Sequence, residues 1–268
     1  MTPEQVFLRG AAVTRHFYAE VDQPSGPGWV PYRTVSTADG LADVIGSVQR
    51  LAPDTPPTVA AALFASSVAA GFAAPLTGAL LRDLRVATPD PDRTWMRPAY
   101  TGVDAVATDR VTLTVLPDDP LTGQPGVVTV ANANELRRAA LSGYRALLEP
   151  LVERVAADTR RGRRALWADA GDRLATYLLL AGRELGDQRA GRREAEALLA
   201  VAEPPIRHRV GWLEFEHRGA PVIWKRRSVC CLVYQAPAWR GQYCATCPLI
   251  PEQETVRRTR KWLADSGA

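Results

Sequence analysis

Four cysteines lie in one window near the end of the 268-residue chain, and no other part of the sequence contains a thiol. Two of them are adjacent and two are separated by a pair of small residues: Cys230, Cys231, Cys244 and Cys247. Four thiols can form disulfides, a dithiol redox site, a zinc site, or a [2Fe–2S] cluster that takes two thiolates on each iron. The spacing has to be weighed against each of these chemistries.

Three of these chemistries fit the spacing poorly. A chain of this size does not need disulfides, which are rare in the cytosol. A redox pair at Cys244 and Cys247 needs a strand-to-helix turn that the flanking sequence does not predict. A zinc ribbon uses two Cys-x-x-Cys knuckles, and adjacent cysteines make a poor second knuckle. Soft thiolates select zinc or iron–sulfur clusters, and the spacing alone leaves these alternatives open.

The segments RRSVCCLVYQ and GQYCATCPL resemble the C-terminal module of the FhuF-type ferric-siderophore reductases. The shared pattern is Cys-Cys, a loop, and Cys-x-x-Cys near the end of a chain of similar length. Here the loop, residues 232–243, is slightly longer than is usual in that family. In the first 200 residues, only the stretch ALWADAGDRLA (165–175) is similar to the family. The resemblance implies that all four cysteines ligate a [2Fe–2S] cluster.

The resemblance also implies an enzyme, a ferric-siderophore oxidoreductase that passes one electron to Fe(III) in a hydroxamate siderophore. No Gly-rich dinucleotide fingerprint follows a strand, so we expect a ferredoxin or flavoprotein to supply the electrons. The expected positions for docking the substrate or the donor are Arg226, Arg227, Trp239, Arg240 and Tyr243. Two alternatives stay open: an Fe–S electron-transfer or sensor protein without siderophore turnover, and a zinc-stabilised interaction module.

The positive charge of the chain is concentrated around the cysteines. The net charge is +4, and residues 201–268 hold eleven Lys/Arg against six Asp/Glu, whereas residues 1–200 are nearly balanced. A local basic field suits an acidic partner or an anionic ligand. We expect no nucleic-acid partner, because the chain shows no binding motif and no basic surface interleaved with aromatic residues.

The N-terminus lacks the basic start and apolar stretch of a signal peptide, so we expect a cytoplasmic protein. The uncharged run over residues 55–81 is long enough to span a bilayer. Its residues are mostly Ala with Ser, Gly and Thr, which insert weakly compared with Leu, Ile and Phe. We therefore expect a buried helix, broken at Pro75, and at most a peripheral association with a membrane.

Hydrophobic periodicity predicts a mainly helical chain with short β segments. The expected helices cover residues 2–18, 39–52, 134–159, 164–186, 188–201 and 251–264, besides the run after Pro57. RVTLTVLP (110–117) and GVVTVAN (126–132) flank turn-forming residues and predict a β-hairpin or small sheet, and VGWLEFEH and APVIWKRR predict another strand pair.

The pattern predicts an α+β fold in two parts. Residues 1–203 are expected to form a mainly helical domain with a small antiparallel sheet, built on an inserted β-hairpin at about 86–130. Residues 204–268 are expected to form a compact cysteine-rich [2Fe–2S] module.

Overall fold

The fold is mainly helical, with small sheets and a cysteine-rich C-terminal segment, as the sequence predicts. The computed structural model describes residues 1–14, 18–99 and 102–266. Its helices are α1 (Pro3–Thr14), α2 (Tyr32–Val35), α3 (Ala38–Leu51), α4 (Pro57–Asp83), α5 (Ala133–Asp158), α6 (Arg163–Glu184), α7 (Gln188–Ala200) and α8 (Glu252–Ser266). The expected helices are all present, with ends shifted by a few residues. Of the first one, expected over 2–18, residues 15–17 lie outside the described residues, and Tyr18 belongs to a strand.

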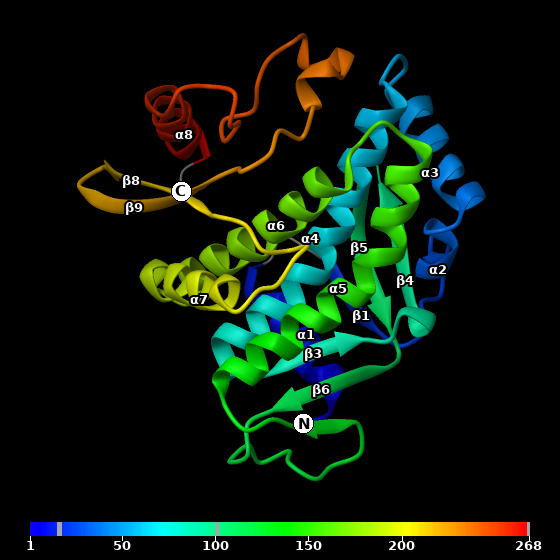
Figure 1. Ribbon diagram of the computed structural model, residues 1–268, viewed down its shortest axis with the longest axis vertical. Helices are drawn as coiled ribbons and strands as arrows, with labels where there is room; N and C mark the ends of the chain where they lie inside the picture. Colours follow the sequence, from blue (N-terminus) through cyan, green and yellow to red (C-terminus); the bar gives the residue numbers. More distant parts are fainter. Residues whose placement is uncertain (15–17, 100–101, 267–268) are drawn as a thin grey trace.

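Helix α4 is the centre of the fold, with α1, α5 and α6 packed around it (Figure 1). Its length and composition would allow it to cross a membrane, but 89% of its most apolar window is buried inside the protein. The expectation of a buried helix is therefore confirmed. The expected break at Pro75 is wrong, because α4 runs through this residue without interruption. Packing on several sides holds the helix together where proline removes one backbone hydrogen bond.

Two glycines let α1 and α4 cross with their backbones in contact. A Cβ on Gly78 would lie 2.0 Å from the carbonyl oxygen of Gly10, and a Cβ on Gly10 would lie 2.2 Å from the carbonyl oxygen of Pro75. Any larger residue at either position has to push the helices apart.

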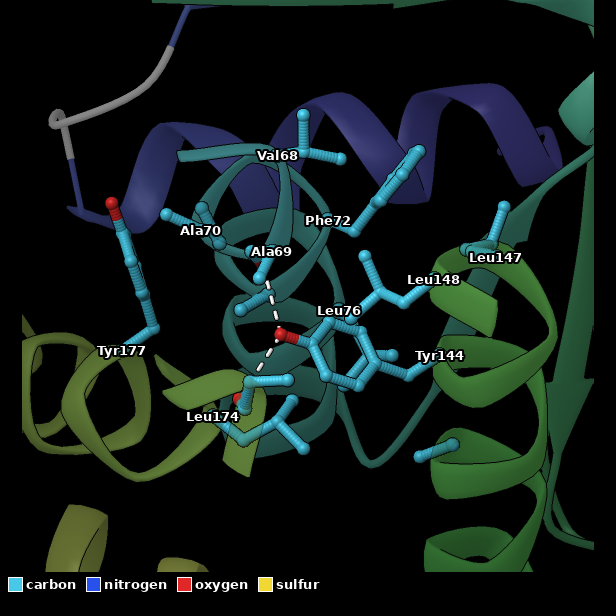
Figure 2. Packing of buried hydrophobic residues seen from close by; sticks show 14 of the residues in the cluster. Val68, Ala69, Ala70, Phe72, Leu76, Tyr144, Leu147, Leu148, Leu174 and Tyr177 are labelled. Carbon is cyan, nitrogen blue, oxygen red and sulfur yellow. Dashed lines mark hydrogen bonds between the residues drawn. The ribbon is translucent and has the colours of Figure 1, made fainter. Parts of the chain in front are cut away.

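Tyr144 of α5 ties three helices together in the core (Figure 2). Its hydroxyl lies 2.9 Å from the carbonyl oxygen of Ala69 in α4 and 3.1 Å from that of Ala170 in α6. The first turn of α5 is capped by Asn132, whose side chain accepts hydrogen bonds from the backbone of Asn134 and Glu135. The helix therefore begins at Ala133, one residue before the expected start at 134.

Two sheets flank the helices. Their strands are β1 (Tyr18–Val21), β2 (Val30–Pro31), β3 (Val86–Pro89), β4 (Thr94–Ala99), β5 (Gly102–Thr108), β6 (Val111–Val115) and β7 (Val127–Thr129). The strand orders are β1-β5-β4-β2 and β3-β6-β7. Both sheets are mixed, because β1 pairs with β5 in parallel and β6 pairs with β7 in parallel.

The expected hairpin within residues 86–130 is therefore wrong in its pairing, since β6 and β7 run in the same direction. The antiparallel partner of β6 is β3, which precedes it in the chain. The loop between β6 and β7 is long enough to return to the start of β6, and the buried ion pair Arg85–Asp119 (2.6 Å) holds it in place.

The C-terminal part leaves the helical core after α7 and begins with an antiparallel hairpin, β8 (Gly211–His217) and β9 (Ala220–Arg226), at the predicted strands (Figure 1). Two short 3₁₀ turns, η2 (Val233–Gln235) and η3 (Pro237–Trp239), follow before α8 closes the chain. All four cysteines lie between β9 and α8.

Candidate metal centre

The four thiols come together as two pairs. The Sγ atoms of Cys230 and Cys247 lie 3.9 Å apart, and the thiols of Cys231 and Cys244 lie close enough to shift each other's pKa in opposite directions. Each pair joins one member of the adjacent cysteines to one member of the Cys-x-x-Cys knuckle. Each pair also combines a buried thiol, Cys231 or Cys247, with a partly exposed one.

The backbone around the cysteines is shaped to turn them toward each other. Leu232, directly after the adjacent pair, has a left-handed conformation (φ 64°) and starts η2. Its N–H points back at the Sγ of Cys230, 3.4 Å away. In the knuckle, the N–H of Cys247 donates to the carbonyl of Cys244 at 3.1 Å. Sharp turns at both ends therefore separate neighbouring thiols and leave the cross-pairs facing.

This donor set fits a [2Fe–2S] cluster. Such a cluster takes two thiolates on each iron, and the two cross-pairs supply them. A backbone N–H directed at a sulfur, as Leu232 provides, also stabilises a negatively charged thiolate.

Arg227 connects the thiols to the helical core. Its guanidinium, at the end of β9, pairs with Asp169 of α6 in a contact that is 14% and 9% exposed on its two sides. The neighbouring Cys244 thiol and the charge of Arg227 hold the pKa of Cys231 well below its usual range, against the effect of burial. Cys231 is therefore prepared to act as a thiolate ligand.

Asp169 thus anchors the cysteine segment to α6, and Asp172, one helical turn later, is a second anchor. Its carboxylate accepts hydrogen bonds from Lys225, which is 5% exposed, and from the N–H of Ser228 at 2.7 Å. His208 lies 3.2 Å from the same carboxylate, so it belongs to this anchor rather than to a metal site. Burial opposes ionisation of Asp172, but His208, Lys225 and Ser228 together lower its pKa to about 2.

Both anchors, Asp169 and Asp172, lie in the stretch 165–175 of α6. Their role was not predicted from the sequence. The signal that could have found them is a pair of carboxylates three residues apart on a helix face that is otherwise apolar.

Arg161 is a further residue whose role the sequence did not reveal. It lies at the turn between α5 and α6, is 9% exposed, and donates to the carbonyl of Cys230 at 2.6 Å. Burial lowers the pKa of Arg161, but nearby Asp169 and Cys230 favour its charged form. It therefore places a positive charge beside the adjacent cysteines.

The five expected docking residues lie in different settings. Arg226 donates to the carbonyls of Pro248 (3.3 Å) and Ile250 (2.8 Å), and so it braces the chain after the knuckle. Tyr243 packs against Tyr234 with ring centroids 4.9 Å apart. Trp239 is 41% exposed and Arg240 is also exposed, and both lie at the tip of the inter-cysteine loop. Only these last two face outward as docking residues would.

The basic side chains of α8 are largely paired within the protein. Arg257 and Arg258 both bond to Glu254, and Lys261 bonds to Asp265. Arg258 also donates to the carbonyl of Tyr243 at 2.6 Å, which fastens α8 to the loop that precedes the knuckle. This helix therefore acts first as a support for the site.

Comparison with known proteins agrees with this geometry. Residues 227–249 match the family model described as the FhuF 2Fe-2S C-terminal domain. The match begins at Arg227 and includes all four cysteines, so the resemblance is confirmed for this segment, and the domain is one that carries a [2Fe–2S] cluster. No curated protein matches the chain.

Proposed function

We propose that this FhuF-type [2Fe–2S] domain makes the chain a ferric-siderophore reductase, which passes one electron to Fe(III) in a hydroxamate siderophore and releases Fe(II). The observation that supports the proposal is the pairing of the four thiols within the segment that matches the family. Cys230 and Cys247 would hold one iron of the cluster, and Cys231 and Cys244 the other. When bound, such a cluster supplies a one-electron carrier.

Reduction of the bound iron by one electron is enough to release it from a hydroxamate siderophore. Hydroxamate oxygens are hard ligands that hold Fe(III) far more tightly than Fe(II). One added electron therefore weakens the complex and lets the iron leave. The protein has to place the ferric complex near the thiols and to compensate the negative charge there, which Arg227 and Arg161 are positioned to do.

A separate protein supplies the electron in this proposal, a ferredoxin or a flavoprotein of the cytoplasm. We place its docking at Trp239 and Arg240, where an exposed ring and an exposed cation lie side by side in the chain between the cysteines. Such donors are commonly acidic, so Arg240→Glu should slow electron delivery at low salt and have less effect at high salt.

The spectrum of the full-length protein tests the cofactor. Aerobically purified protein should be reddish-brown, with iron and acid-labile sulfide at about two each per chain. Cys244→Ala should remove the visible absorption, whereas Gln242→Ala, exposed in the same loop, should keep it. Colourless protein with one zinc per chain would defeat the cluster and favour a zinc-stabilised interaction module.

A second measurement tests the reaction. The chemically reduced protein is mixed with a ferric trihydroxamate, and Fe(II) is trapped with a chromogenic chelator. Reoxidation of the protein with formation of about one Fe(II) per electron supports the reductase. A reduced protein that no ferric chelate reoxidises would be an electron carrier or a sensor instead.

A further inference from the structure

A small pocket lies directly beside the Cys-x-x-Cys knuckle, between α6 and β9. Its volume is about 130 Å³. Its walls include Trp224 and two threonines, one of which, Thr246, lies between the two cysteines of the knuckle. They also include four basic side chains: Arg173, Arg183, Lys225 and Arg227. The backbone N–H of Arg227 donates to the carbonyl of Thr246 at 3.2 Å, so the pocket and the knuckle share a wall.

The pocket holds more positive than negative charge. Lys225 and Arg227 are each paired with one carboxylate, Asp172 and Asp169. Arg173 lies 3.9 Å from Asp169, which Arg227 already occupies, and its guanidinium bonds to the Ser66 hydroxyl at 3.0 Å through Nε. Two carboxylates thus face four cations.

Arg183 carries most of this excess. Among the residues that the structure describes, no carboxylate pairs with it. Its Nη2 donates to the carbonyl of Ile223, and its guanidinium lies over the ring of Trp224, 4.6 Å from the centroid. Burial lowers the pKa of Arg183 to about 10, which still leaves it charged at neutral pH. An arginine held over a ring, with Nε and Nη1 free of the one hydrogen bond that Nη2 makes, is arranged for an oxyanion.

We propose that this pocket binds a carboxylate carried by the siderophore, so that the preferred substrate of the reductase is a ferric hydroxamate complex with a free carboxylate arm. The proposal rests on the proposed function and names its substrate class. A volume of about four waters admits a carboxylate but not a whole chelate, so the iron centre stays outside, next to the knuckle.

Gallium(III) complexes separate binding from reduction, because Ga(III) has the charge of Fe(III) and does not accept an electron under these conditions. The probes are two complexes of one linear trihydroxamate: one keeps its terminal amine and carries +1, and the other is succinylated there and carries −1. Titration calorimetry with the cluster-loaded full chain should show the succinylated complex binding roughly tenfold more tightly.

Arg183→Gln should bring the ratio of the two dissociation constants close to one. Arg192→Gln is the matched control, since Arg192 also lies over a tryptophan, Trp212 at 5.7 Å, but does not line the pocket. If Arg183→Gln does not fold, Arg173→Gln gives the same test from the other wall. The ratio compares two ligands on one protein, so a partial loss of folded protein does not change it.

Equal binding of the two complexes to the wild type would overturn the proposal, and so would a ratio that survives both pocket variants. Inorganic phosphate titrated alone identifies a site for free anions: phosphate bound by the wild type and lost in Arg183→Gln, with no discrimination between the gallium complexes, also overturns it. If both ferric complexes are reduced and the gallium complexes bind equally, the reductase function is supported and the carboxylate pocket is refuted. If the gallium complexes bind unequally and neither ferric complex is reduced, the pocket is supported and the reductase function is refuted.

Discussion

Arg161 puts a buried positive charge against the backbone of Cys230 without being a ligand. Reduction of a thiolate-bound cluster adds a negative charge, and a cation nearby makes that addition easier. Arg161 should therefore set the reduction potential rather than the assembly of the site.

Arg161→Gln should lower the reduction potential by on the order of tens of millivolts, because the charge is lost in a partly buried setting. Protein-film voltammetry or a dye-mediated titration measures the shift. Arg160→Gln is the control, since the neighbouring side chain is exposed and should change the potential little. An unchanged potential in Arg161→Gln would show that this arginine only holds the backbone.

At the scale of elements, helix α6 holds the cysteine segment through Asp172. The folded pKa of about 2 lies below the ordinary value of 3.8. The carboxylate therefore contributes about 2 kcal/mol to the free energy of unfolding above roughly pH 4, and this contribution is lost as the pH falls through 2.

Asp172→Asn should cost about 3–5 kcal/mol at pH 7, because Lys225 would remain buried without its counter-charge. Urea unfolding followed by helical circular dichroism at pH 7, 4 and 2.5 measures both effects, and the variant should lose less stability on acidification than the wild type. Asp104→Asn breaks the exposed pair with Arg97 and should cost less than about 1 kcal/mol. Equal losses in the two variants would argue against the anchor.

The crossing of α1 and α4 gives a prediction about packing. Gly78→Ala places a methyl group where the carbonyl of Gly10 lies, so it should destabilise the protein by roughly 1–3 kcal/mol. Gly46→Ala, in α3, meets only the end of the Arg50 side chain at 3.5 Å and should be neutral or stabilising by up to about 1 kcal/mol. Thermal unfolding compares the two, and a stable Gly78→Ala protein would show that the helices can slide apart.

Local signals in the sequence predicted the helices and the pair β8–β9 well. Features that depend on partners distant in sequence were not predicted. The parallel pairing of β6 with β7 depends on β3 and on the Arg85–Asp119 pair, neither of which lies inside the segment that suggested a hairpin. The continuity of α4 through Pro75 likewise depends on the surrounding helices rather than on propensity.

The same limit applies to the site. The spacing of the cysteines and its resemblance to a family predicted the thiols, but Asp169, Asp172 and Arg161 lie some 60 to 70 residues earlier and reach them only in the folded chain. The docking role expected of Arg226 stays a prediction, and the folded chain adds a contact that the sequence did not indicate: its side chain braces the backbone carbonyls of Pro248 and Ile250.

At the scale of the whole molecule, the division at residue 204 stays a prediction. The C-terminal part is joined to the helical part by buried contacts: Asp169 with Arg227, Asp172 with Lys225, and Arg183 with the carbonyl of Ile223. In isolation, residues 204–268 would lose the counter-charges of two buried cations.

The fragment 204–268 should therefore bind much less iron and sulfide than the full chain when both are reconstituted side by side. Visible absorption per mole of protein measures the difference. As a control, fragment 1–203 is added in equal amount, which restores the counter-charges that fragment 204–268 lacks and should raise its iron and sulfide content. A fragment 204–268 that assembles the full chromophore alone would establish it as an independent module.

The ion pairs of Asp169 with Arg227 and of Asp172 with Lys225 form without any metal. They fix the segment of chain that leads directly into Cys230 and Cys231. The surroundings of the four thiols can therefore form when the chain folds, while the thiols of Cys230 and Cys244 are still partly exposed to solvent. We therefore expect the chain to fold around these ion pairs first and to take up iron and sulfide afterwards, so that the metal-free full chain already shows the helical circular dichroism of the loaded protein.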